Sequence, residues 1–276
     1  MAAFIRIKIM AVRYIVTALY LGSICFNASA AVASEMSAHY IVQKSSEVDK
    51  VSSWSAHAVM RLTAKNGSER VRESLNVNQL DKNGYDQKRL ANFIAPADIK
   101  GTKVLIHEHR DGEDDIWVYL PSMNKVRRLV SSNKKDSFVG SDFSYTDILT
   151  PRVDDYDHTL LRRENLDNVP CFVIESVPKT DKIKRDTGYS RTVSWIRTDN
   201  FVRIQADFSD VGGLPYKHMH VSAVTEVSAH DGKWLIERVE MLDIQSGHRT
   251  EIIFKDIKVG RKADENMLSP NSLDRK

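Results

Sequence analysis

The fold of this 276-residue chain is decided by the stretch WVYLPSMNKVRRLVSSNKKDSFVGSDFSYTDI, residues 117–148. It begins with four bulky residues typical of a β-strand, which ends before Pro121. It then passes through a basic turn into a polar run that nevertheless carries Phe138, Val139, Phe143 and Tyr145. Bulky apolar side chains in a polar loop indicate that this segment covers an apolar surface built by other strands.

Strands are expected on both sides of this stretch, separated by tight turns. Four residue pairs accept the positive φ angles of a hairpin turn: Asn66-Gly67, Asn83-Gly84, Asp111-Gly112 and Asp231-Gly232. Strand-like runs flank each pair, and similar runs continue from residue 171 to residue 259. Ten or more antiparallel strands with short connections predict a mainly β protein, one large meander curled into a barrel or half-barrel.

Alternation along residues 70–77 predicts a sheet with one buried face and one solvated face. Val71, Leu75 and Val77 share one side of this run, and polar residues occupy the other side. We therefore expect the apolar set to face the core.

The buried face of a single curled sheet needs a cover. Residues 37–51 have apolar residues at helical spacing and predict one N-terminal helix. Residues 131–150 would supply the rest of the cover, either as a mobile lid or as a fixed plug at one end of the core. No Pro- or Gly-rich linker interrupts residues 34–276, so we expect one domain there.

The first 33 residues read as a cleaved secretory signal peptide. Arg6, Lys8 and Arg13 precede an apolar run at residues 14–24, and two A-x-A cleavage sites follow. The run is short for a membrane-spanning helix, although an N-terminal anchor is the alternative. The expected location is the periplasm.

The charge balance excludes a nucleic-acid binder. The chain has 40 basic and 37 acidic residues, and removal of the three basic residues of the leader leaves 37 of each. Only Cys171 would remain after cleavage, so no internal disulfide can form. Cys171 begins an apolar strand-like run and reads as a buried structural thiol.

Motifs of catalysis are scarce. The sequence contains no phosphate-binding loop, nucleophile elbow or H-E-x-x-H helix. His107 with His109, and His218 with His220, have the strand spacing of a metal-chelating pair, which would suit a metal-dependent hydrolase. Histidines on a solvated strand face are the better interpretation, so we expect no enzyme, no metal and no cofactor.

A basic cluster lies in the turn after the first strand of the opening stretch. It consists of Lys125, Arg127 and Arg128, with Lys134 and Lys135 beyond it. It would bind an acidic partner or lipid head groups, or it would protect the edge of a sheet from further pairing.

The opening stretch also resembles a known family, the outer-membrane lipoprotein-sorting-protein-like relatives of the periplasmic carrier LolA. The shared pattern is a Trp-x-Tyr-x-Pro strand, a basic turn and then Asp-Ser-Phe-x-Gly-Ser-Asp-Phe-Ser-Tyr. The matching residues here are Trp117, Tyr119, Pro121, Lys125, Arg127, Arg128, Asp136, Ser137, Phe138, Gly140, Ser141, Asp142, Phe143, Ser144 and Tyr145. The resemblance continues through "CFVIESVPK" and "VSWIRTDNFVRIQADFSD" over nearly all of residues 34–276.

This resemblance implies an unclosed antiparallel β-barrel whose hydrophobic concavity is capped by helices and loops. In the carrier branch the concavity takes acyl chains. Members of the other branch, the one that this chain resembles, are often linked with export pumps of the resistance-nodulation-division type. No residue here corresponds to the acyl-contacting Arg of the carriers. The resemblance favours a lid over a fixed plug.

The leading hypothesis is a periplasmic carrier of lipids or lipoproteins that holds acyl chains under a mobile lid. Its partner would be a lipid or acylated protein, together with an inner-membrane exporter or an outer-membrane acceptor. The alternative is an accessory or sensor module, with a filled cavity, that docks on an exporter or an envelope signalling protein. The expected cavity and lid residues are Met60, Leu62, Leu75, Phe93, Leu105, Trp117, Tyr119, Phe138, Phe143, Tyr145 and Trp195. Because a slip of one residue exchanges the two strand faces, the inward face is left open.

Overall fold

The computed structural model describes residues 36–228 and 232–275, which belong to one compact unit, Met36–Lys276. The expected signal peptide, residues 1–33, lies outside the described residues.

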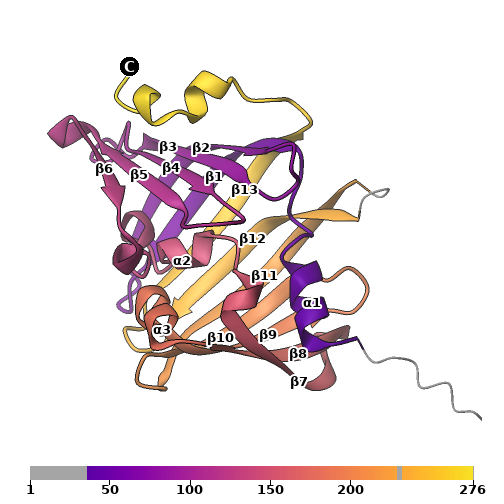
Figure 1. The fold of residues 1–276 in the computed structure, drawn as a ribbon. Helices are drawn as coiled ribbons and strands as arrows, with labels where there is room; N and C mark the ends of the chain where they lie inside the picture. The colour runs from indigo at the N-terminus through magenta and orange to yellow at the C-terminus, as the bar shows by residue number, and fades with distance from the viewer. Residues whose placement is uncertain (1–35, 229–231, 276) are drawn as a thin grey trace, which may run out of the picture. The chain divides into compact units, whose positions relative to one another are not determined.

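The described residues form one antiparallel sheet of thirteen strands (Figure 1). The strands are β1 (Ser53–Thr63), β2 (Glu69–Leu80), β3 (Gln87–Ala95), β4 (Lys103–Glu108), β5 (Asp115–Leu120), β6 (Lys125–Leu129), β7 (Tyr156–Leu166), β8 (Val169–Pro178), β9 (Tyr189–Arg197), β10 (Arg203–Asp210), β11 (Pro215–Ser228), β12 (Lys233–Asp243) and β13 (Arg249–Val259). Their order in the sheet is β6-β5-β4-β3-β2-β1-β13-β12-β11-β10-β9-β8-β7. Two meanders therefore meet where β1 pairs with β13, and β6 and β7 are left as unpaired edges.

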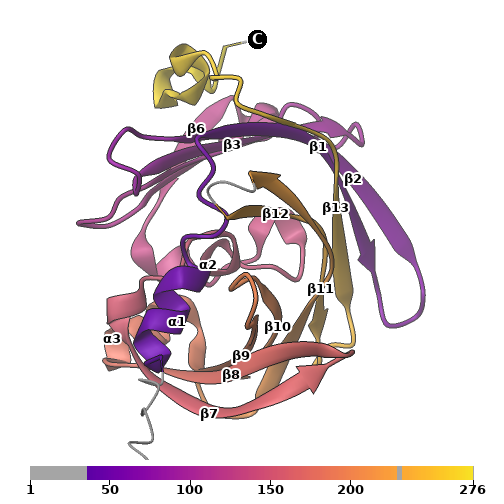
Figure 2. The same ribbon diagram turned by 90° about the vertical axis from the view of Figure 1, so that its right-hand side faces the viewer.

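The sheet curls around its concave face without closing into a barrel (Figure 2). Short turns set this topology, as at Asn66, whose side-chain oxygen accepts a hydrogen bond from the Ser68 amide at 3.0 Å. Gly67 beside it has φ 83°, a conformation that suits glycine. The mainly β half-barrel expected from the sequence is confirmed.

Few helices accompany the sheet, and α1 (Ala38–Ser45) is the first of them. Its N-cap Ser37 accepts a hydrogen bond from the Tyr40 amide at 3.2 Å, and its buried Ile41 packs against Phe172, Ile174 and Ile196. The helix α1 thus covers the concave side of β8 and β9, and it ends earlier than residue 51, the limit that the periodicity suggests.

The connection from β6 to β7, residues 130–155, crosses the open side of the half-barrel, and we call residues 131–155 the covering segment. It contains η2 (Ser131–Asn133), η3 (Phe138–Gly140), α2 (Tyr145–Ile148) and η4 (Val153–Asp155). The remaining short elements are η1 (Pro121–Met123), α3 (Asp181–Thr187), η5 (Glu265–Leu268) and η6 (Pro270–Ser272).

The convex face of β3, β4 and β5 is covered by the C-terminal residues 263–275 (Figure 1). Leu268 and Leu273 are buried there against Leu90 and Leu105. The Lys103 ammonium holds the segment by donating a hydrogen bond to the Leu273 carbonyl at 2.9 Å. Both faces of these strands are therefore shielded from solvent, which explains why they carry apolar residues on both sides.

Candidate functional site

The concave face encloses a cavity of about 360 Å³. Apolar side chains of the central strands form its floor, among them Ala58, Met60, Ile106, Met219 and Ile252. Residues of α1, of the turn after it and of the covering segment close the opposite side. Sites for small molecules span about 300–1,000 Å³, so this cavity has room for one slender ligand.

The aromatic residues of the covering segment belong to the core of the protein. Phe138, Phe143 and Tyr145 are only 6%, 4% and 7% exposed. Phe138 packs against Phe93 of β3 with ring centroids 6.3 Å apart, and against Tyr145 at 5.5 Å. Phe138 and Phe143 also line the cavity, so the segment is at once part of the core and part of the cavity wall.

A sharp backbone reversal places these aromatics. Val139 has φ 48° and Gly140 has φ 72°, so two consecutive residues are left-handed. A Cβ atom at residue 140 would lie 3.2 Å from a guanidinium nitrogen of Arg72. Glycine is therefore favoured at position 140 by its φ angle, and a larger residue would also press on the Arg72 guanidinium.

Hydrogen bonds tie the covering segment to the sheet. The Asp142 amide donates to the Thr250 hydroxyl oxygen at 3.0 Å, and that hydroxyl donates to the Asp142 carboxylate at 2.6 Å. Burial raises the pKa of Asp142 above its usual value, with the Thr250 hydrogen bond acting against this effect.

Asp147 of α2 makes a second connection. Its carboxylate accepts from the Ser144 amide at 2.7 Å, which completes a capping box at the start of α2. The Tyr189 hydroxyl donates to it at 2.8 Å, and the Lys217 ammonium lies 3.2 Å away in a buried ion pair. Burial, followed by the charge of Asp147, raises the pKa of Tyr189 well above its usual value.

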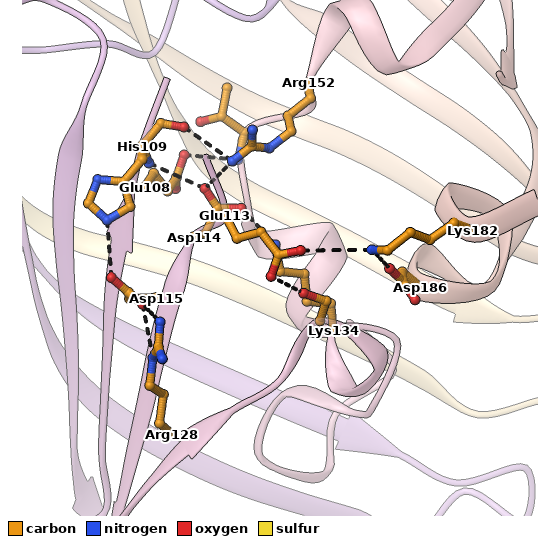
Figure 3. A network of polar contacts seen from close by, with 12 residues as sticks. Glu108, His109, Glu113, Asp114, Asp115, Arg128, Lys134, Arg152, Lys182 and Asp186 are labelled. Atoms are coloured by element: carbon orange, nitrogen blue, oxygen red, sulfur yellow. Dashed lines mark hydrogen bonds and ion pairs between the residues drawn. The ribbon is translucent and has the colours of Figure 1, made fainter. Parts of the chain in front are cut away.

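Asp114, at the turn between β4 and β5, holds both ends of the covering segment (Figure 3). Its nearly buried carboxylate accepts from the Lys134 ammonium at 2.9 Å and from the Arg152 guanidinium at 3.0 Å. We call this arrangement the Asp114 clasp. Arg152 also donates to the carbonyl of His109 at 3.2 Å.

One wall of the cavity is polar. Ser74, Asn76 and Asn78 of β2 line it, and the buried Asn78 amide has no hydrogen-bond partner among the described residues. Arg89 of β3 lies 3.0 Å from the Glu108 carboxylate and 3.9 Å from that of Asp49. Burial raises the pKa of Asp49, although Arg89 acts to lower it.

Six of the predicted cavity residues lie on the concave side. Met60, Phe138 and Phe143 line the cavity itself. Leu62, Phe93 and Tyr145 belong to the packed core beside it.

The other five lie on the opposite face of the sheet, which corrects the sequence-based prediction. Leu105, Trp117 and Tyr119 pack under the C-terminal segment, and Leu75 is 48% exposed. Trp195 is directed away from the cavity, and its indole N–H donates to Glu164 of β7. Side chains alternate between the two faces of a strand, so an error in facing moves a whole set of residues to the other side. The polar side of β2 faces the cavity, opposite to the expected direction. The strands β4 and β5 have apolar residues on both sides, so their pattern does not indicate which side faces the cavity.

The predicted partner-binding residues lie on the edge strand β6. Lys125, Arg127 and Arg128 are all exposed, and the Arg128 guanidinium is bound by the Asp115 carboxylate. Burial acts to raise the pKa of Asp115, but the hydrogen bonds from Arg128 and His109 together bring it below its usual value. Both functions considered for the cluster, partner binding and edge protection, agree with this exposed position.

Three of the four histidines in the predicted pairs contact other protein groups. A ring nitrogen of His107 donates to the Leu268 carbonyl at 2.8 Å, and His109 pairs with Asp115 at 3.2 Å. His218 contacts Asp207 at 2.6 Å. In residues 36–228 and 232–275, no group of three His, Cys, Asp or Glu side chains is arranged to hold a metal ion.

Sequence reasoning missed the charged residues that organise the site. Asp147 could have been found, because Ser144 and Asp147 have the spacing of a capping box. Asp114 and Arg89 could not, since their partners at residues 152 and 108 are distant in the sequence. No helix in the described part of the chain is long and apolar enough to cross a membrane.

Comparison with known proteins agrees with this architecture. A family model described as an uncharacterized protein matches residues 85–275. The crystal structure of a DUF1329 family protein from Desulfovibrio piger is 30% identical, with a TM-score of 0.78 over 86% of this chain and 97% of that one. An outer membrane lipoprotein-sorting protein domain from Vibrio parahaemolyticus is 27% identical, with a TM-score of 0.78 over 86% and 98% of the two chains.

A LolA superfamily protein from Nitrosomonas europaea has the same fold, at 21% identity and a TM-score of 0.64 over 85% of this chain and 98% of that one. No curated protein sequence matches the chain. From the family model and the 30% identical relative, the chain belongs to the DUF1329 family, and its fold is the one seen in the LolA superfamily protein.

Proposed function

We propose that the protein is a periplasmic carrier that holds the apolar chain of a lipid or of an acylated protein in its concave cavity. The observation that carries this proposal is the cavity of about 360 Å³, lined largely by apolar side chains and covered by α1 and the covering segment. The sequence of residues 1–33 supports export, and the similarity to a lipoprotein-sorting protein domain supports a lipid-related cargo.

Burial of the chain would supply the affinity. Each methylene group removed from water contributes about 0.8 kcal/mol, so ten methylenes contribute about 8 kcal/mol. This gain is comparable to the estimated 4–15 kcal/mol cost of association. Binding through an apolar chain therefore needs a largely preformed cavity, and the concave face offers one.

The covering segment would serve as the lid of this carrier. Its aromatic residues are buried when the cavity is closed, and its two ends are held by the Asp114 clasp. Release of the cargo would require the segment to move away from the cavity while the strands of the sheet stay paired. Loops that gate binding sites commonly move in this way.

Filling the cavity tests the proposal. Ala91 of β3 lines the cavity, and Leu75 of β2 is exposed on the convex face. We expect Ala91→Trp to lower the affinity for a fluorescent fatty acid at least tenfold, because the indole occupies the space of the chain. Leu75→Trp is the matched control and should leave the affinity unchanged. Equal affinities in both variants, with melting temperatures that show both to be folded, would refute binding in this cavity.

A further inference from the structure

Three arginines line the cavity, and one of them differs from the other two. Arg89 is paired with Glu108 at 3.0 Å, and Arg152 is paired with Asp114 at 3.0 Å. The guanidinium of Arg203, the first residue of β10, makes no ion pair or hydrogen bond with any described residue. It is therefore a partly buried cation in the wall of a largely apolar cavity, and no described residue uses its donors.

The nearby carboxylates do not neutralise Arg203. The carboxylates whose charge acts most strongly on its guanidinium are those of Asp147 and Asp49. Asp147 is already engaged by the Lys217 ammonium at 3.2 Å and by the Tyr189 hydroxyl at 2.8 Å. The Asp49 carboxylate already faces the Arg89 guanidinium at 3.9 Å.

An unpaired guanidinium in such a place is costly for the folded protein. Burial disfavours the charged form and lowers the pKa of Arg203, with the two carboxylates acting against this effect. A cation that is partly removed from water and has no counter-charge weakens the folded state. A group of this kind inside a binding cavity is explained when a ligand supplies the missing counter-charge.

We propose that the cavity takes an anionic amphiphile and that Arg203 binds its acidic head group, a carboxylate or a phosphate. This inference rests on the proposed function and specifies its ligand: one apolar chain in the apolar part of the cavity, with an acid against the guanidinium. The planar fork of Arg offers two parallel donors to either acid. The floor beside it, formed by Val202, Phe208 and Met219, receives the chain.

Competition with a neutral fluorescent reporter, N-phenyl-1-naphthylamine, tests this assignment. The competitors share a chain and differ in the head group: hexadecanoate, hexadecyl phosphate and hexadecanol. We expect the wild-type protein to bind one or both acids about 10- to 100-fold more tightly than the alcohol, which is the range expected of a charge-assisted hydrogen bond. The acid with the higher affinity distinguishes a fatty acid from a phospholipid as the source of the head group.

Arg203→Met keeps the length of the side chain and removes its charge. This variant should bind all three competitors with the affinity of hexadecanol, and its melting temperature should equal or exceed that of the wild type. Arg203→Lys should retain part of the preference for acids. Arg191→Met is the matched control, because Arg191 is an exposed residue on the adjacent strand, paired with Glu175; it should keep the full preference.

The outcomes separate the two proposals. Equal binding of acids and alcohol by the wild type, or a preference that survives in Arg203→Met, overturns the role of Arg203 and leaves the carrier function standing. Failure of all three competitors to displace the reporter overturns both. Loss of the preference in Arg203→Met alone, with binding of hexadecanol intact, supports the assignment.

Discussion

At the scale of single residues, the reversal at Val139 and Gly140 is the most demanding feature of the covering segment. A β-branched residue at φ 48° is unfavourable, because its Cβ approaches the neighbouring backbone. The surrounding contacts must hold it there, since Phe138 on one side is buried against Phe93 and Tyr145. Local strain of this kind often marks binding sites.

At position 139 the Gly variant should therefore be more stable than the Ala variant, the reverse of the usual order. Both substitutions remove the isopropyl group, so their difference reports the backbone conformation. We expect Val139→Gly to be more stable than Val139→Ala by about 1 kcal/mol in urea denaturation, because only glycine tolerates this φ angle. The same pair at Val126, in the exposed edge strand β6, should show the usual order, with Ala the more stable. The usual order at both positions would contradict the strain.

Tyr145 should make the protein sensitive to alkaline pH. Burial raises its pKa from 10.0 to about 12, assisted by the charge of Asp136. The folded state then keeps a proton that the unfolded state loses, so stability from this group is complete below pH 10 and is lost as the pH rises to about 12. The shift corresponds to a loss on the order of 2–3 kcal/mol. Stability curves at several pH values should fall less steeply for Tyr145→Phe; an identical decline in both proteins would exclude this role.

At the scale of elements, the covering segment is fastened to the sheet both at its ends and in its middle. The Asp114 clasp joins residues 134 and 152, and Asp147 joins α2 to Lys217 and Tyr189 (Figure 3 shows the clasp). These bonds agree with either version of the cover considered from the sequence, because a lid also needs bonds that hold it closed. The distinction between lid and plug is a matter of how easily the clasp opens.

Removal of the clasp should loosen the covering segment before it affects the sheet. In Asp114→Asn, the charge that holds Lys134 and Arg152 is absent, so we expect faster hydrogen–deuterium exchange across residues 134–152 and faster release of a bound fatty acid. Exchange in β1 and β13 should be unchanged, since they lie at the centre of the sheet. Asp115→Asn is the matched control, because the ion pairs of Asp115 are with His109 and Arg128, outside the covering segment. Release at the wild-type rate despite faster exchange would argue for a plug.

The order of the strands could be predicted from the sequence, but which side of each strand faces the cavity could not. Hairpin turns such as Asn66-Gly67 are local, and a meander follows from a series of them. The direction of β2 is decided by distant partners: Arg72 lies against Gly140, and Asn78 lines the cavity. Since a polar inner face of this kind inverts the usual pattern, alternation alone assigned Leu75 to the wrong side.

At the scale of the whole molecule, the two faces of the sheet are buried in different ways. Its concave face is lined by side chains that leave a cavity, and its convex face over β3, β4 and β5 is closed by residues 263–275. The resemblance carried by residues 117–148 predicted the half-barrel and its cover. It did not predict the second cover on the convex face, because no strand pattern reveals which apolar residues a C-terminal segment will hide.

Neighbouring residues on opposite faces should therefore separate binding from stability. Trp117 packs on the convex side against His107, with ring centroids 4.9 Å apart, and Ile106 lines the cavity. Trp117→Ala should cost on the order of 2 kcal/mol of unfolding free energy, because the C-terminal segment loses a packing partner. Its affinity for a fluorescent fatty acid should equal that of the wild type.

Ile106→Ala should cost about 2–5 kcal/mol and should also weaken fatty-acid binding several-fold, because the chain loses wall contacts along the cavity. Urea denaturation gives the first quantity for each variant, and titration with the fatty acid at a temperature where both are folded gives the second. The decisive comparison is that of the two affinities. A weaker affinity in Trp117→Ala with an unchanged one in Ile106→Ala would mean that the ligand binds on the convex face, between the sheet and its C-terminal cover.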